Sequence, residues 1–177
     1  MLAVDSSPSS PYRNRLYAAW ARYQSDPRGI YLTYSNDTGK TWTKPVRVSD
    51  SIRNNTVQRT TVLAVNGNGD LGILWYDSRR DSTNACFDMF FAISLDGGET
   101  FLPNVKVSNE MSCSNVQGNI VNKFDVAQRW PAGGDYIGLS SSSDGLFHAA
   151  WADSRNKVYQ LWTATISINA EVKTEGN

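Results

Sequence analysis

The feature that most constrains this chain is an internal repeat. Three segments, 16–42, 71–101 and 146–166, each open with a short apolar run that contains a tryptophan: Trp20, Trp75 and Trp151. After a polar loop, each is followed by a second run rich in aromatic and β-branched residues. Runs of this length and composition, bounded by Gly, Asn, Asp and Ser, are typical of strands. Such self-similarity predicts a chain built from one repeated β-unit.

Flanking runs extend each unit towards four strands. An apolar run precedes each tryptophan strand, at 1–4, 60–65 and 136–139, and further runs follow at 45–48 and 104–107. The segment Asn66–Asp70 suits a turn between the first two strands of a unit, because Asn and Gly tolerate positive φ. We therefore expect an all-β fold of β-propeller type, with about three four-stranded antiparallel blades. They lie at about 1–50, 56–110 and 132–172 of a single domain, 1–177. A β-sandwich with regular hairpins is the alternative.

Two turns between the third and fourth strands share the pattern Ser-x-Asp-x-Gly-x-Thr-aromatic. The residues that define it are Ser35, Asp37, Gly39, Thr41 and Trp42 in the first turn, and Ser94, Asp96, Gly98, Thr100 and Phe101 in the second. A short acidic side chain inside a turn can accept hydrogen bonds from backbone N–H groups, and Gly permits a conformation that other residues resist. We expect structural roles for these residues.

With these turns, the chain resembles the sialidase-like (neuraminidase-like) family of β-propellers with BNR, or Asp-box, repeats. Two Trp-x-Asp-Ser-Arg segments and Gly134–Leu139 add to the resemblance, which covers nearly the whole chain. It implies a glycan-binding or glycan-processing module, with its site on the rim opposite the Asp boxes. An enzyme of this kind would be a glycoside hydrolase of exo-sialidase type, and the family suggests a secreted or periplasmic protein. Non-enzymatic receptors also carry such boxes. A non-catalytic protein-interaction scaffold and a truncated fragment without activity of its own therefore stay open as alternatives.

The resemblance also implies candidate site residues. Family sialidases hold a substrate carboxylate with three arginines, use a tyrosine as nucleophile and use an aspartate as acid and base. The catalytic candidates in this chain are Tyr136 and Asp135, and the candidates for substrate binding are Arg59, Arg79, Arg129 and Arg155. The alternative for two of these arginines is a structural role. Asp77–Arg79 and Asp153–Arg155 recur in two units, whereas a catalytic residue is normally unique.

Charge and cysteine content limit the partners and cofactors that we expect. Lys plus Arg and Asp plus Glu number 17 each, so we expect neither nucleic acid nor a membrane as partner. The family resemblance implies acidic glycans as ligands. Two cysteines and a single histidine argue against a metal site, and we expect no cofactor. Cys86 and Cys113 form either one disulfide or two free thiols, because spacing alone does not decide between them.

The start of the chain and the number of repeat units bear on targeting and on assembly. The polar start, 1–11, lacks the pattern of a signal peptide, and no apolar stretch is long enough to span a bilayer. Three units are fewer than a closed propeller normally contains. We therefore expect either a fragment of a larger propeller or a homodimer that completes a six-bladed ring about a two-fold axis.

Overall fold

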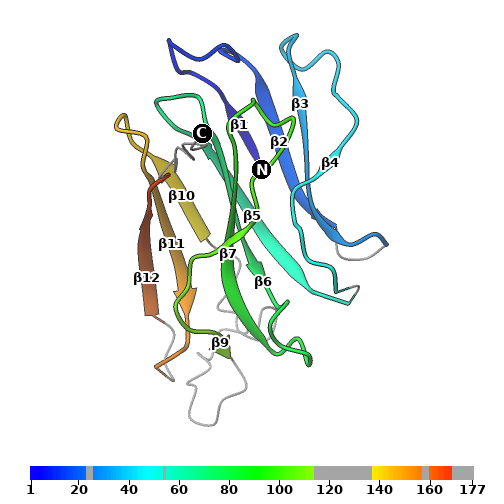
Figure 1. Cartoon of the computed structure of the whole chain (residues 1–177), viewed down its shortest axis with the longest axis vertical. Coiled ribbons are helices and arrows are strands. Elements are labelled where there is room, and N and C mark those ends of the chain that lie inside the picture. The colour runs from blue at the N-terminus through cyan, green and yellow to red at the C-terminus, as the bar shows by residue number, and fades with distance from the viewer. Residues whose placement is uncertain (23–25, 54, 114–136, 157–159, 169–177) are drawn as a thin grey trace, which may run out of the picture.

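Figure 1 shows the computed structural model, which describes residues 1–22, 26–53, 55–113, 137–156 and 160–168. Within these residues the fold is all-β and the strands pair in antiparallel fashion, which confirms the expected fold class at that level. Three sheets stand side by side, with the second between the other two. No helix among the described residues is long and apolar enough to cross a membrane.

The first two sheets have matching strand orders. The first runs β1–β2–β3–β4, formed by Leu2–Val4, Leu16–Arg22, Gly29–Ser35 and Val46–Arg47. The second runs β5–β6–β7–β8, formed by Gln58–Val65, Leu71–Asp77, Cys86–Ser94 and Val105–Lys106. The sequence did not indicate one further strand, β9 (Ser112–Cys113), which pairs with the start of β7.

The third sheet contains β10 (Ile137–Ser141), β11 (Phe147–Asp153) and β12 (Gln160–Ile166), in that order. Residues 132–136 and 169–172 of the third expected unit lie outside the described residues. The number of blades therefore stays a prediction, while the three antiparallel sheets are a finding.

Two hydrophobic cores fill the two junctions between sheets. Tyr17 and Leu32 of the first sheet meet Trp75 of the second in one core, and all three side chains are fully buried. Leu74 of the second sheet meets Phe147 of the third in the other core. Successive residues of a strand point to opposite faces, so Leu74 and Trp75 enter different cores. This explains why β6 is buried along its whole length and reads as a continuous apolar run.

The first Asp turn is held by its own side chains. Asp37 accepts hydrogen bonds from the backbone N–H of Thr41 at 2.8 Å and from its hydroxyl at 2.6 Å. Ser35 donates to Asp37 at 2.8 Å and accepts from the N–H of Gly39, whose φ is 86°. The hydrogen bonds from Thr41 and Ser35 lower the pKa of Asp37 to about 2. The indole of Trp42 donates to the carbonyl of Gly39 at 3.1 Å.

The second Asp turn repeats this geometry in a more enclosed setting. Asp96 accepts from Ser94 at 2.8 Å and from the N–H of Thr100 at 2.9 Å, and Ser94 accepts from the N–H of Gly98 at 2.7 Å. Partial burial works against ionisation of Asp96, but the hydrogen bonds from Thr100 and Ser94 outweigh it and lower its pKa. Phe101 packs against the core of the first junction.

Hydrogen bonds between loops link neighbouring sheets. Arg15, just before β2, donates to the carbonyl of Gly97 in the second Asp turn at 2.7 Å. Asn66, in the turn after β5, donates to the carbonyl of Gly145 in the third sheet's first turn at 2.9 Å. Each junction between sheets therefore has a polar link as well as an apolar core.

Candidate functional site

Strand direction sorts the loops onto two rims. The Asp turns and the turns within β1–β2, β5–β6 and β10–β11 share one rim, at the top of Figure 1. The described parts of the loops that follow β2, β6 and β11, and of the crossing from the first sheet to the second, lie at the other end, here called the lower rim. Longer loops on a rigid β-scaffold are where binding residues usually lie. The candidate arginines Arg79 and Arg155 both lie on the lower rim.

Arg79 is held by an aspartate at the end of β6. Its Nε and Nη2 donate to Asp77 Oδ2 at 3.0 and 2.8 Å, and its Nη1 forms an ion pair with Asp50. Asp77 is fully buried and also accepts from the indole of Trp75 at 2.9 Å and from Gln58 at 2.7 Å. The Asp77 carboxylate is therefore the centre of a small buried network.

The surroundings of Arg79 stabilise its charged form. Its guanidinium stacks over the ring of Phe90 at 4.0 Å and also donates to Asn104 at 3.2 Å. Burial lowers the pKa of Arg79, but the hydrogen bonds and charges of Asp77 and Asp50 outweigh burial and raise the pKa above its ordinary value. The side chain is only 16% exposed.

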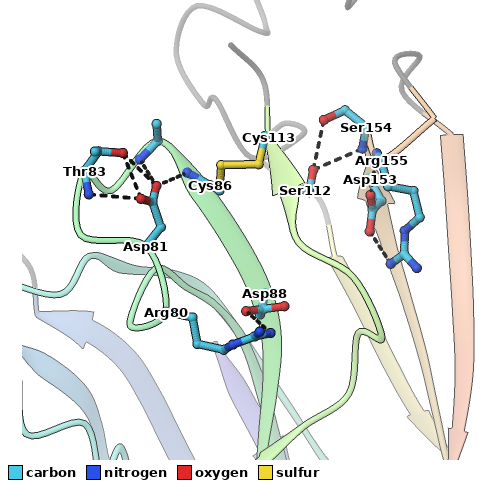
Figure 2. Close-up of a disulfide and its surroundings, with 11 residues drawn as sticks. Arg80, Asp81, Thr83, Cys86, Asp88, Ser112, Cys113, Asp153, Ser154 and Arg155 are labelled. Carbon is cyan, nitrogen blue, oxygen red and sulfur yellow. Dashed lines mark hydrogen bonds and ion pairs between the residues drawn. A yellow bond between two sulfur atoms is a disulfide. The ribbon is translucent and has the colours of Figure 1, made fainter. Parts of the chain in front are cut away.

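The third sheet repeats this arrangement at the end of β11. Asp153 accepts from the indole of Trp151 at 3.0 Å, from the backbone N–H of Arg155 at 2.8 Å and from its guanidinium at 2.5 Å. Arg155 also donates to Asn109 and stacks over Trp162 at 4.0 Å. Figure 2 shows the Asp153–Arg155 pair beside the end of β11. With a side chain 3% exposed, Arg155 is enclosed more fully than Arg79.

The two pairs therefore act as braces, each joining a strand end to a neighbouring loop. This geometry fits the structural alternative for Arg79 and Arg155 better than contact with a ligand, because most of their donors already face protein acceptors. Within the described residues, the buried Nε of Arg155 is the donor of these two side chains that has no partner. Arg59 lies on β5 opposite Tyr76 and is half-buried, next to a register shift between Arg59 and Val62. The other candidates, Arg129, Asp135 and Tyr136, lie outside the described residues.

A disulfide crosses the lower rim and settles the state of the two cysteines. Cys86, at the start of β7, is bonded to Cys113 in β9 (Figure 2). The loop before it folds around Asp81, which accepts from the backbone N–H groups of Thr83 and Cys86 at 3.0 and 2.8 Å. Burial opposes ionisation of Asp81, but these hydrogen bonds outweigh it and lower its pKa. The Asp81 carboxylate thus holds the backbone of this loop through hydrogen bonds within the loop.

A pocket lined by three arginines opens on the same rim below the first sheet. Its volume is about 470 Å³, and its lining residues are Asp26, Pro27, Arg28, Arg47, Ser51, Ile52 and Arg53. They come from the loop after β2, from β4 and from the crossing to the second sheet. No sequence pattern singles out these arginines, because they stand in three separate segments without a shared motif.

The pocket arginines are only partly satisfied by the protein. Arg47 donates to the carbonyl of Ser51 at 2.9 Å, and Arg53 donates to the carbonyl of Asp81 at 2.6 Å and to Asn84 Oδ1 at 2.5 Å. Arg28 lies 3.7 Å from Asp26, whose side chain is 83% exposed. Within the described part of the chain, the buried Nε atoms of Arg28 and Arg53 have no hydrogen-bond partner. Among the described lining residues, three guanidinium groups and one exposed carboxylate give this pocket a positive charge.

The described residues hold no group of three His, Cys, Asp or Glu side chains placed to bind a metal ion. Lining groups of the pocket are guanidinium, hydroxyl, carboxylate and aliphatic. Guanidinium groups bind carboxylate, sulfate and phosphate oxygens in a planar, two-point geometry. This arrangement can therefore bind an anionic group.

Comparison with known proteins gave matches in structure alone. No family model matches the sequence, and no curated protein matches it. An intramolecular trans-sialidase from Ruminococcus gnavus superposes with a TM-score of 0.51 at 12% identity, over 94% of this chain and 33% of that one. A Hadza microbial sialidase gives a TM-score of 0.54 at 13% identity, over 89% of this chain and 34% of that one. An α-L-arabinanase from Penicillium chrysogenum gives 0.53 at 15% identity, over 94% of this chain and 45% of that one.

At such low identity, the likeness concerns the fold. The chain spans less than half the length of each of these three proteins. Two of the three are sialidases and one is an arabinanase, and all are glycosidases of the β-propeller type. The antiparallel sheets of this chain therefore have a sialidase-like fold relationship with β-propeller glycosidases.

Proposed function

We propose that this chain is a glycan-binding module that takes an acidic glycan on its lower rim. The observation that carries the proposal is the pocket formed by Arg28, Arg47 and Arg53, which gathers three guanidinium groups around about 470 Å³. The fold relationship to sialidases and an arabinanase supports a glycan-related role at a coarse level.

The pocket suits a sugar that carries a carboxylate or sulfate. Among the described residues, the buried Nε groups of Arg28 and Arg53 have no hydrogen-bond partner, and the Nε of Arg28 lies 3.7 Å from Asp26 Oδ1. An anionic ligand would supply oxygens to both. Ile52 is 97% exposed at the edge of the pocket and offers an apolar surface to the carbon face of a sugar ring. Such a site combines a charged anchor with an apolar contact, as ligand sites usually do.

The proposal is binding, with hydrolysis kept as a separate prediction. Glycoside hydrolysis usually needs two carboxyl groups across the scissile bond, and Asp26 is the one carboxylate among the described lining residues. Hydrolysis by Asp135 and Tyr136 stays a prediction, because both residues lie outside the described residues. The Cys86–Cys113 disulfide supports a role in an oxidising compartment, where such bonds persist.

The test is calorimetric titration with matched oligosaccharides. A sialylated, a uronic-acid and a sulfated oligosaccharide would each be compared with its neutral counterpart at low and at high salt. We expect binding of at least one acidic member, weakened by salt because the pocket is open to solvent. Arg28→Ala should weaken it roughly tenfold or more, since hydrogen bonds between charged groups contribute about 1.5–3 kcal/mol.

Arg13→Ala is the matched control, because it removes the same charge from an exposed position near the opposite rim. It should leave binding unchanged. Equal affinity for acidic and neutral glycans, or equal losses in the Arg28 and Arg13 variants, would show that the pocket does not recognise the anionic group.

A further inference from the structure

The middle strands of the three sheets place a tryptophan at the same position of the ladder. The pairs across the next strand are Trp20–Tyr31, Trp75–Phe90 and Trp151–Trp162. Trp75 is 0% exposed beneath the first sheet, and Trp151 is 3% exposed beneath the second. Trp20 has the same place in the first sheet but is 37% exposed. The first sheet thus carries the tryptophan of a sheet junction, and no sheet formed by the described residues covers it.

Other side chains continue this uncovered surface, here called the first-sheet outer face. On β1, Leu2 is 72% exposed and Val4 is 48% exposed. Trp42 of the first Asp turn is 42% exposed, whereas its counterpart Phe101 packs into the core of the first junction. Leu2, Val4 and Trp42 border an apolar hollow of about 330 Å³. An apolar face of this composition marks an interaction surface.

The glycines of the two Asp turns show the same difference. Gly98 lies against the first sheet so closely that a Cβ there would be 2.8 Å from Leu32 and 3.3 Å from Tyr17. A Cβ at Gly39, the equivalent glycine, would meet only Leu16 and Trp42 of its own sheet, at 3.6 and 3.8 Å. The positive φ of each turn already requires these glycines, so the difference lies in their surroundings: the first sheet packs on Gly98, and none of the described residues of another sheet packs on Gly39.

The third sheet has small side chains at the positions that face the second sheet in the first one. In the first sheet, Ala19 and Ala21 of β2 face the second sheet, and Ala19 is 1% exposed there. On β11 the equivalent alanines, Ala150 and Ala152, point to the open side of the third sheet, since Phe147, Ala149 and Trp151 fill the other. Leu161 of β12, 75% exposed, pairs with Ala152 on that side. We call this the third-sheet outer face.

We infer that a second copy of this chain docks head to tail, with its third-sheet outer face on the first-sheet outer face. The contact would repeat the existing junction, in which the alanines of β2 receive the aromatic face of the second sheet. Small side chains on one face leave room for the bulk of Trp20 and Trp42 on the other. If both ends of two copies meet, the contacts close about a two-fold axis.

The first experiment is light scattering on a sizing column across a dilution series of the chain. The expected mass at the concentrated end is twice the 19.6 kDa of one chain, falling towards a single mass on dilution. A chain that stays monomeric throughout would overturn the inference and leave the face for a sheet from a different polypeptide.

Two variants distinguish head-to-tail docking from other contacts. Leu2→Glu places a charge on the first-sheet outer face, and Thr163→Glu places one on the third-sheet outer face, where Thr163 is exposed. Each variant alone should remain a monomer. An equimolar mixture should recover part of the doubled mass, because one of the two junctions then joins two intact faces while the other joins the two altered ones.

Leu95→Glu is the control, because Leu95 is 51% exposed in the second Asp turn and lies on neither face. It should dimerise as the unmodified chain does. If Thr163→Glu also dimerises normally while Leu2→Glu does not, the first-sheet outer face pairs with itself, and head-to-tail docking is wrong. A mixture of the two variants that stays monomeric leads to the same conclusion.

Discussion

Replacing Asp77 by Ala tests whether Arg79 is a brace or a ligand-binding residue. Asp77 is fully buried and accepts hydrogen bonds from Gln58, Trp75 and Arg79. Truncating it would leave a guanidinium that is only 16% exposed without its main partner, although Asp50 would still neutralise part of its charge. A ligand-binding arginine would respond differently, since loss of its neighbour would alter affinity more than stability.

The expected cost is about 3–5 kcal/mol, which is typical when one partner of a buried ion pair is removed. With a urea dependence of about 2 kcal/mol per molar, a loss of about 4 kcal/mol lowers the unfolding midpoint by about 2 M. Removing both charges, as in Asp77→Ala with Arg79→Met, should cost less than the sum of the single changes, because no lone charge stays buried.

Urea unfolding followed by circular dichroism measures these differences. Arg28→Ala is a useful contrast, since its partner lies 3.7 Å away and is largely exposed, and it should change stability by less than about 1 kcal/mol. A stability of Asp77→Ala within about 0.5 kcal/mol of the unmodified chain would refute the brace, because changes of that size are typical of unconstrained surface positions.

Three further predictions concern the disulfide, the stability of the fold at low pH and the glycine of the second Asp turn. Changing Cys86 and Cys113 to Ser should cost about 3.5 kcal/mol in the chain-entropy account of a bridge between residues 27 positions apart, measured by urea unfolding without reductant. Asp37 has a lowered pKa of about 2, so its contribution to stability is present above about pH 4 and is lost as the pH falls towards 2. Asp37→Asn should flatten the stability profile in that window, and an unchanged profile would contradict the assignment. Gly98→Ala should cost about 1–3 kcal/mol more than Gly39→Ala in thermal unfolding, because a Cβ at Gly98 would clash with the first sheet.

Sequence reasoning succeeded where the deciding interactions are local. The turn around Asp37 closes within a few residues, so its pattern of Ser, Asp, Gly and Thr could be recognised directly. The strand of Trp75 was also recognisable, because burial on both sides demands a continuous apolar run. The strand of Trp151 is buried mainly on one side, so its buried and more exposed residues alternate. Alternation and turn residues together predict most strands of such a fold.

Features that depend on distant parts of the chain could not be predicted in this way. The bond between Cys86 and Cys113 depends on the pairing of β7 with β9, and β9 has only two residues. Arg28, Arg47 and Arg53 share a pocket only because three segments meet at the end of the first sheet. Neither residue spacing nor composition predicts that these segments lie close together. By contrast, the recurrence of Asp-x-Arg in two units could be read from the sequence, and the structural role that it suggests for these pairs stays a prediction.

The hydrogen bonds from Arg15 to Gly97 and from Asn66 to Gly145 have a consequence for how the chain unfolds. In linear repeat proteins, units contact only their neighbours and can fray from an end. Here the middle sheet shares an apolar core with each neighbour, and a polar link spans each junction as well. Detaching the first or the third sheet would expose an apolar face of the middle sheet and would also break the hydrogen bond between loops at that junction. The three sheets should therefore be lost together, in one cooperative transition, although the sequence that encodes them is modular.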